Sequence, residues 1–186
     1  EISLGLVGSE MCIRDSFSPL ADTSLPDVGF VYLPGGYPEL YLAALSANRQ
    51  MLQSIRRYVE SGGKLLAECG GMMYLCDEIR DKNGDVYPMA GVLHQSATME
   101  NMKLRLGYRT LLYNETRLKG HEFHYSRLVE QQNPLPSCAV AYTAKGVETD
   151  TPLYHYKNVW AGYTHLYWAD PVGNEWFTKF VIDGNT

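Results

Sequence analysis

One cysteine of this sequence lies where a buried strand is expected to turn sharply into a helix, a position suited to nucleophilic chemistry. Residues 65–75 begin as an apolar run, pass through Cys69, Gly70 and Gly71, and continue with apolar residues that suit a helix. Such a junction has the geometry of a nucleophile elbow. The helix N-terminus behind Cys69 favours the thiolate, which is the reactive form of the side chain. Taken alone, this segment is explained equally well by a small buried cysteine.

A histidine late in the chain is the candidate base for this cysteine, since cysteine catalysis of acyl transfer requires a base close to the thiol. His165 lies at the end of an expected strand, just before a turn and the last helix. Catalytic side chains of open α/β sheets gather at the carboxyl ends of strands. His165 follows Cys69 by 165 − 69 = 96 residues, so the fold must bring the two together. A lone histidine with a structural role is the competing interpretation.

Two glycine turns are candidates for the backbone donors that stabilise the oxyanion of acyl transfer. Gly35 and Gly36 follow an expected strand, and a turn of that kind presents its amides to an anion. The N–H of Gly70, directly after the cysteine, is the natural second donor. The alternative role of Gly35 and Gly36 is a tight turn with positive φ, and the two roles are compatible.

A His-x-x-His pattern at His121 and His124 invites a metal-binding interpretation. On a strand, however, residues three apart point to opposite faces, which weakens shared ligation of one ion. We therefore expect no metal site there. Both histidines are expected to line or support a pocket, and a purely structural role is the alternative.

The elements that must position these residues are predicted from hydrophobic periodicity. Short apolar runs at 28–33 and 64–68 predict buried parallel strands. A helix of about five turns is expected between them, from Pro38 to Ser61. Its buried stripe consists of Tyr41, Leu45, Leu52, Ile55 and Val59. Two strand–helix units in succession predict an α/β fold with a parallel sheet and right-handed crossovers.

After residue 77 the pattern changes to shorter strands. Residues 81–85 are expected to form a turn between strand-like segments, and further strands are expected at 89–93, 104–113, 122–129, 138–144, 154–156 and 160–167. Asp170 and Pro171 are expected to begin the last helix, as its cap and first residue. The apolar face of that helix consists of Trp176, Phe177, Phe180 and Val181.

Composition favours a single globular domain over a nucleic-acid-binding or membrane-spanning protein. A chain of 186 residues suits one domain with a full core, and a net charge of -5 disfavours nucleic acid or an anionic membrane as partner. No apolar run approaches the roughly 20 residues needed to span a bilayer. Four cysteines are scattered without metal-type pairs, and no secretory signal is visible, which favours a reducing cytoplasm.

Residues 1–16 are predicted to be an unreliable segment. The stretch 5–16 resembles translated sequencing-adaptor read-through, which would have replaced a genuine first strand and its helix. An ordinary N-terminal segment is the competing interpretation. We place no function there, disregard Cys12, and assign the functional domain to residues 17–186.

Four motifs together carry a family resemblance. They are Leu-Pro-Gly-Gly-Tyr-Pro-Glu at 33–39, Ala-Glu-Cys-Gly-Gly-Met-Met-Tyr-Leu at 67–75, Gly-His-Glu-Phe-His-Tyr-Ser at 120–126 and Tyr-Thr-His-Leu-Tyr at 163–167. The set resembles the class I glutamine amidotransferase domain and, more narrowly, the C-terminal domain of the cobyrinate a,c-diamide synthase family. The resemblance covers about residues 17–170. It implies an α/β, three-layer, flavodoxin-like fold with a mixed, mainly parallel sheet.

The resemblance also implies roles for individual residues. Cys69 would attack the side-chain amide of glutamine to form a glutamyl thioester, His165 would move protons, and the Gly36 and Gly70 amides would hold the oxyanion. The expected pocket residues are Tyr37, Glu68, His121, Glu122, His124 and Tyr167. Many class I enzymes carry a carboxylate two residues after the histidine, where this sequence has Tyr167. His165 would then be oriented by other groups or tolerate looser orientation.

The implied partners follow from the same resemblance. No Gly-x-x-x-x-Gly-Lys-Ser/Thr phosphate loop occurs in the sequence, so no cofactor is expected in this domain. ATP and Mg²⁺ are expected in an N-terminal synthase domain, in the same or a separate chain, that binds a corrinoid acceptor and receives the ammonia. The alternatives are a related synthase acting on cobyric acid precursors, a nickel tetrapyrrole or a cell-wall lipid, and a catalytically silent binding domain of the same fold.

Overall fold

The computed structural model describes residues 15–183, so the prediction about residues 1–16 lies almost entirely outside the described residues. A central four-stranded sheet has the order β1 (Phe30–Leu33), β2 (Lys64–Glu68), β12 (Val159–Gly162) and β11 (Leu153–Tyr156). The first three strands run parallel and β11 is antiparallel, which matches the predicted mixed, mainly parallel sheet.

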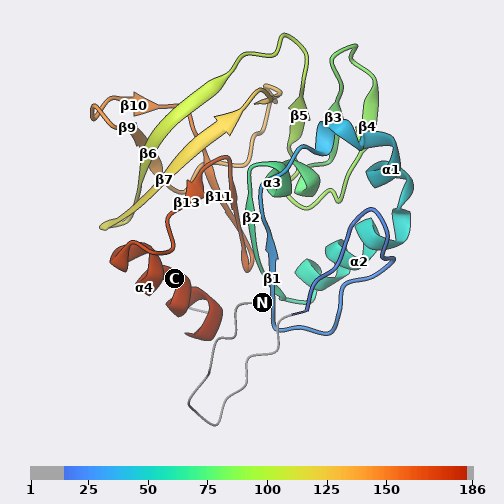
Figure 1. Cartoon of the computed structure of the whole chain (residues 1–186), viewed down its shortest axis with the longest axis horizontal. Helices are drawn as coiled ribbons and strands as arrows, with labels where there is room; N and C mark the ends of the chain where they lie inside the picture. Colours follow the sequence, from blue (N-terminus) through green and yellow to red (C-terminus); the bar gives the residue numbers. More distant parts are fainter. Residues whose placement is uncertain (1–14, 184–186) are drawn as a thin grey trace, which may run out of the picture.

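Both faces of the central sheet are buried, which explains the continuous apolar runs of β2 and β12. Leu65 and Ala67 of β2 face a core shared with the helices α1 to α3, whereas Leu66 faces a second core. In β12, Trp160 likewise joins the second core. The fold therefore has three layers, with α1 and α2 on one side of the central sheet and α4 with an antiparallel sheet on the other (Figure 1).

One continuous helix was predicted from Pro38 to Ser61, and this prediction is wrong because the segment is divided. The segment forms a 3₁₀ turn η1 (Pro38–Leu40) and the helices α1 (Leu42–Ala47) and α2 (Arg49–Glu60). Asn48 breaks the helix because its side chain caps α2 at the N–H of Met51. Tyr41, predicted to be buried, is 52% exposed because it lies in the junction before α1, whereas Leu45, Leu52, Ile55 and Val59 are buried as predicted.

The predicted strand at 89–93 is also wrong. The helix α3 (Gly70–Leu75) follows β2, and residues 89–93 cover its C-terminal end. The N–H groups of Ala90 and Val92, for example, donate to the carbonyls of Tyr74 and Leu75. These apolar residues are buried because they satisfy the free carbonyls of a helix end, not because they pair in a sheet.

The turn at 81–85 is confirmed, and it connects two strands of a small sheet. This sheet has the order β4 (Val86–Pro88), β3 (Glu78–Arg80), β5 (Ser96–Thr98) and β8 (Arg127–Leu128). Asp81 holds the turn together, since its carboxylate accepts bonds from the N–H groups of Asn83 and Asp85.

An antiparallel sheet covers the second core. Its order is β10 (Glu148–Thr149), β9 (Val140–Thr143), β6 (Arg105–Tyr113), β7 (Thr116–His124) and β13 (His165–Leu166). The predicted strand at 122–129 is two strands, because β7 begins earlier and a break after His124 sends β8 to the small sheet. The predicted strand at 160–167 is interrupted after Gly162, so His165 leaves the central sheet and pairs with His121.

The last helix is confirmed. The helix α4 (Pro171–Thr178) begins after Asp170 and continues into a π-helical turn η2 (Lys179–Asp183). Trp176 and Phe180 are buried in the second core, against which Phe177 and Val181 also pack. No helix among residues 15–183 is long and apolar enough to cross a bilayer.

Candidate active site

Cys69 occupies a strained elbow between β2 and α3. Its φ of 49° and ψ of -108° lie in a region that residues with a Cβ rarely adopt. The backbone is held on both sides, since the Cys69 N–H donates to Gly162 and the Cys69 carbonyl accepts from Met73. The Sγ atom lies 3.8 Å from the Phe123 carbonyl oxygen of β7. The elbow therefore places the thiol between the central and the antiparallel sheets.

His165 lies against this thiol, as the sequence analysis predicted. The Cys69 side chain is the largest cause, and Glu68 the next, of a pKa of His165 raised to about 9, with burial acting in the opposite direction. The imidazole stacks on that of His121 with ring centroids 5.0 Å apart. Gly35 touches its edge, because a Cβ added there would lie 2.2 Å from Cε1. The structure thus brings a thiol and a partly buried imidazole together.

The two glycine turns that were predicted to supply oxyanion donors meet at the elbow. A Cβ added to Gly70 would lie 2.6 Å from the Gly36 carbonyl oxygen and 2.9 Å from the Gly36 nitrogen. One added to Gly71 would lie 2.2 Å from the Leu33 carbonyl oxygen. These glycines allow backbone to pack directly on backbone beside Cys69. Gly36, Tyr37 and Gly70 line one pocket of about 300 Å³.

Glu68, predicted to line the pocket, lies directly against the imidazole of His165. Its side chain is 4% exposed, and Oε2 lies 3.7 Å from His165 Nδ1. The Tyr32 hydroxyl donates to Oε2 at 2.7 Å, and the Leu166 N–H donates to Oε1 at 3.1 Å. Burial, followed by the charge of Glu68, raises the pKa of Tyr32. The sequence offered a signal for this contact, an acidic residue at the end of a buried strand, directly before the cysteine.

The pocket residues predicted on β7 lie on both faces of that strand, and Tyr37 and Tyr167 lie outside it. His121 faces the site, where it stacks on His165 and also on Tyr167, whose ring centroid lies 5.7 Å away. Burial, followed by the charge of His165, lowers the pKa of His121. Tyr37 is 56% exposed, on the turn after β1. The structure thus brings His121 to the cysteine–histidine pair, with Tyr167 one ring further out.

Glu122 and His124 lie on the opposite face of β7, as strand alternation predicted for His124. Glu122 is fully buried and forms an ion pair of 2.7 Å with Arg109. His124 stacks on Tyr163 with ring centroids 3.7 Å apart. Both line a separate polar pocket of about 250 Å³. Within residues 15–183 no group of three or more histidine, cysteine or acidic side chains is arranged to hold a metal ion.

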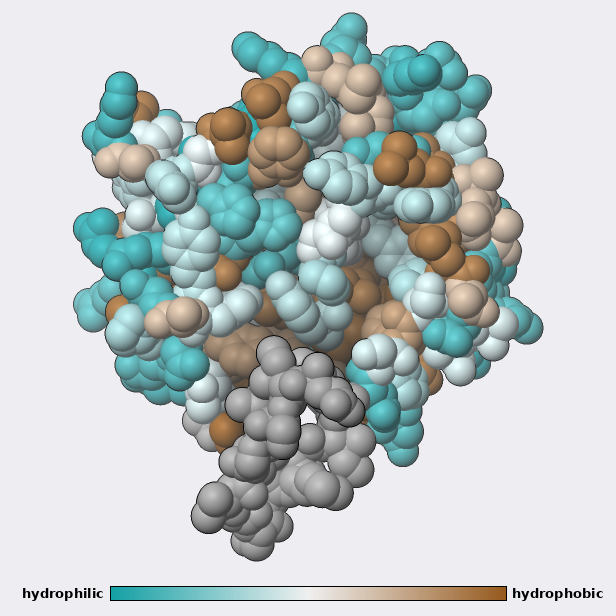
Figure 2. All heavy atoms as spheres, viewed as in Figure 1, coloured by the Kyte–Doolittle hydropathy of each residue, from teal (hydrophilic) through white to brown (hydrophobic). Residues whose placement is uncertain are grey.

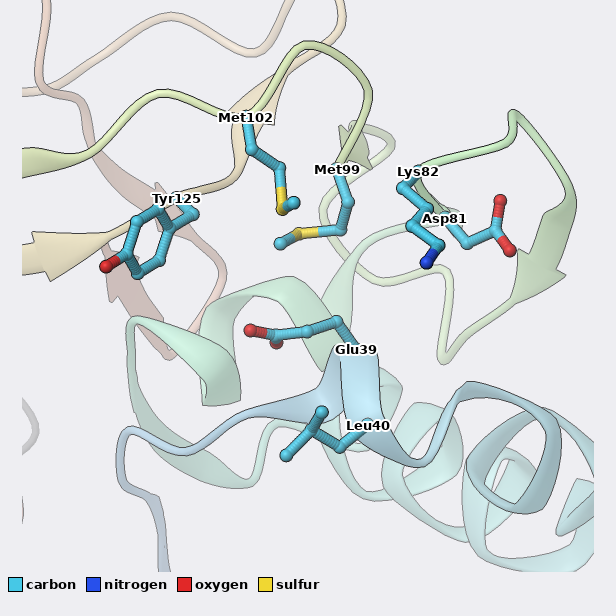
Figure 3. A pocket seen from close by; sticks show the side chains of 7 residues that line it. All are labelled: Glu39, Leu40, Asp81, Lys82, Met99, Met102 and Tyr125. Atoms are coloured by element: carbon cyan, nitrogen blue, oxygen red, sulfur yellow. The ribbon is translucent and has the colours of Figure 1, made fainter.

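Another pocket, of about 460 Å³, has side chains from several segments of the chain on its walls (Figure 3). Glu39 and Leu40 come a few residues after the Gly35–Gly36 turn, and Tyr125 lies two residues after Phe123, whose carbonyl contacts Cys69. Glu39 points its carboxylate toward this space, and burial raises the pKa of that carboxyl. The molecular surface is hollowed between the antiparallel sheet and the side carrying α1 and β4, with hydrophobic side chains on both rims (Figure 2).

Comparison with solved structures first establishes the fold class. A solved structure titled "Crystal structure of glutamine amidotransferase" matches with a TM-score of 0.54, covering 83% of this chain and 79% of that chain. At 18% sequence identity this likeness shows the fold, and it confirms the predicted fold class.

The sequence comparisons then give the family. A family model described as "CobB/CobQ-like glutamine amidotransferase domain" matches residues 7–172, and the chain belongs to that family. A hydrogenobyrinate a,c-diamide synthase of Pseudomonas aeruginosa is 39% identical over 87% of this chain and 36% of that protein. A cobyrinate a,c-diamide synthase of Salmonella typhimurium is 35% identical over 82% of this chain and 35% of that protein. The resemblance found in the motifs is confirmed, and the chain spans little more than a third of these relatives.

Proposed function

We propose that this domain hydrolyses glutamine through a covalent thioester on Cys69 and delivers ammonia to an amidating synthase. One observation carries the proposal: the strained elbow holds Cys69 against His165, at the point where the Gly36 and Gly70 turns meet. A nucleophile, a proton carrier and backbone donors are the parts that acyl transfer requires.

The chemistry runs in two steps. The Cys69 thiolate attacks the side-chain carbonyl carbon of glutamine, and the Gly36 and Gly70 N–H groups stabilise the oxyanion. The C–N bond breaks as protonated His165 gives its proton to the leaving nitrogen, so ammonia departs and a γ-glutamyl thioester remains. Water then attacks the thioester while His165 takes its proton, and glutamate leaves with the thiolate restored.

The ammonia is proposed to serve the amidation named in the relatives. The acceptor would be the a- and c-carboxylates of cobyrinate, in cobalamin biosynthesis, with ATP and Mg²⁺ supplied by a synthase domain. Hydrogenobyrinate is a second candidate acceptor, because relatives at 39% and 38% identity are named for it. We place the reaction in the cytoplasm, since Cys69, Cys76 and Cys138 are all free thiols.

A glutaminase assay tests this proposal. The chain alone should release glutamate slowly from glutamine, and Cys69→Ala should release none. Supplying the remaining part of the Pseudomonas aeruginosa relative with ATP, Mg²⁺ and cobyrinate or hydrogenobyrinate should speed glutaminase turnover and yield amide product. Absence of glutamate with a folded chain would favour a silent binding domain. Amide formed by the chain alone would show a nucleotide site within it.

A further inference from the structure

The position where many class I enzymes carry a carboxylate holds Tyr167, whose ring stacks on His121. A histidine that pairs with a nucleophilic thiol needs a partner on its other ring nitrogen to fix its orientation and tautomer. In this chain a carboxylate reaches that nitrogen from a different element, the end of β2.

We propose that Glu68 is the positioning residue for His165. This inference rests on the proposed glutaminase function and assigns one part of its machinery. The Glu68 carboxylate lies 3.7 Å from His165 Nδ1, an ion-pair distance, which leaves Nε2 as the ring nitrogen for the Cys69 sulfur.

Two hydrogen bonds that do not involve the imidazole hold the Glu68 carboxylate in place. Tyr32 on β1 donates to Oε2 at 2.7 Å, and the Leu166 N–H on β13 donates to Oε1 at 3.1 Å. The Glu68 side chain is 4% exposed, so water competes little for these oxygens. Because Leu166 directly follows His165, the same carboxylate holds both the backbone and the ring of the histidine segment. A catalytic histidine needs supporting contacts of this kind to stay in its productive orientation.

The placement follows from the topology of the central sheet. β2 and β12 are parallel neighbours, and Glu68 pairs with Gly162 at their carboxyl ends. The chain then carries His165 across to β13 within three residues of that pair. One short segment, Glu68 and Cys69, therefore supplies both the nucleophile and the group that orients its base.

A titration of His165 tests the contact without requiring activity. In a Cys69→Ala background the thiol, the largest cause of the raised pKa, is absent, so the effect of Glu68 can be measured alone. Adding Glu68→Gln should lower the pKa of His165, followed by NMR, by about one unit, as expected on losing an opposite charge at this range. Glu68→Asp should restore part of it, and Tyr167→Phe should not lower it. An unchanged pKa in folded Glu68→Gln overturns the proposal.

The kinetic arm separates this inference from the proposed function. In the Cys69-containing chain, Glu68→Gln should lower the kcat of glutamine hydrolysis by roughly 10- to 100-fold with little change in KM, less than a directly hydrogen-bonded triad carboxylate contributes. Normal kcat in folded Glu68→Gln would overturn the positioning role while leaving the glutaminase function intact. If the wild-type chain hydrolyses no glutamine, the proposed function fails, and the titration alone decides whether Glu68 holds His165.

Discussion

Two cysteines lie at opposite ends of the same six-residue helix, and the structure gives them opposite surroundings. Cys69 precedes α3 in a strained conformation, with His165 and backbone turns around its thiol. Cys76 follows α3, is fully buried, and has its Sγ 3.6 Å from the Met72 carbonyl oxygen. Burial, followed by the charge of Asp77, raises the pKa of Cys76.

The comparison shows that burial alone does not separate the two thiols. Cys69 is 5% exposed and Cys76 is 0% exposed, so both would count as core residues. Both sulfurs lie near a backbone carbonyl, so the difference lies in the other neighbours. These are a histidine and glycine turns beside Cys69, and a methionine and an aspartate beside Cys76. The surroundings of Cys69 are therefore those that favour a reactive thiolate, and the surroundings of Cys76 are not.

The largest predicted effect is the loss of activity on substituting Cys69. Cys69→Ala should abolish glutamine hydrolysis, a loss on the order of 10⁴-fold or more as for other covalent nucleophiles. Cys76→Ala should keep activity and cost about 1 kcal/mol of unfolding free energy, because it leaves a small cavity in the core. Steady-state kinetics and urea unfolding of both variants measure the contrast. Inactive but folded Cys76→Ala would contradict the assignment.

The second effect concerns the base. His165→Ala should lower kcat by about 10²–10⁴-fold, the usual contribution of a positioned acid–base group. His121→Ala and His124→Ala should cost less, since one stacks behind His165 and the other faces the opposite side of β7. If either variant is more damaging than His165→Ala, the base has been assigned to the wrong histidine.

The third effect concerns the packing of the Gly70 and Gly36 backbones beside Cys69. Gly70→Ala should lower stability by about 1–3 kcal/mol, as overpacking does, and should lower kcat as well, because its Cβ meets the Gly36 backbone at 2.6 Å. Gly29→Ala is the matched control, since a Cβ there meets nothing within 4 Å. Thermal melts and kinetics should separate the two, and equal behaviour would mean that the turns do not pack as described.

The smallest effect is a pH dependence of stability. The pKa of His165 rises from 6.5 to about 9 on folding, so protonated His165 stabilises the folded chain fully below about pH 6.5. That contribution is lost as the pH rises through about 9. His165→Gln should therefore lower the unfolding midpoint more at pH 6 than above pH 9, in denaturant titrations at both values. A pH-independent difference would contradict the thiol and carboxylate contacts.

Local patterns were sufficient to predict the strands at the centre and the elbow. β2 and α3 follow from apolar runs and glycine positions, whereas the pairing of Cys69 with His165 also needed the family resemblance, because a structural role for each residue alone was left open. The break at Asn48 was missed because its capping bonds compete with a helical pattern that continues on both sides. The segment 89–93 was missed because burial against a helix end produces the same apolar run as a strand.

The contact of Glu68 with His165 could not be derived from either segment alone. It depends on β2 and β12 being parallel neighbours and on the chain leaving the central sheet after Gly162. The sequence placed Glu68 in the pocket and left the orienting group of His165 unnamed. Strand order, which arises from packing over the whole chain, supplies the missing information.

The most direct test maps the cysteine that reacts with a glutamine-mimicking alkylator, by peptide mass spectrometry at graded times. Cys69 should be modified first, activity should be lost in proportion, and excess glutamine should protect Cys69 from modification. Cys76 and Cys138 should react slowly, because burial raises the pKa of both thiols, that of Cys138 to about 11. Loss of activity with the label on another cysteine, and Cys69 unmodified, would contradict the proposal that Cys69 is the nucleophile.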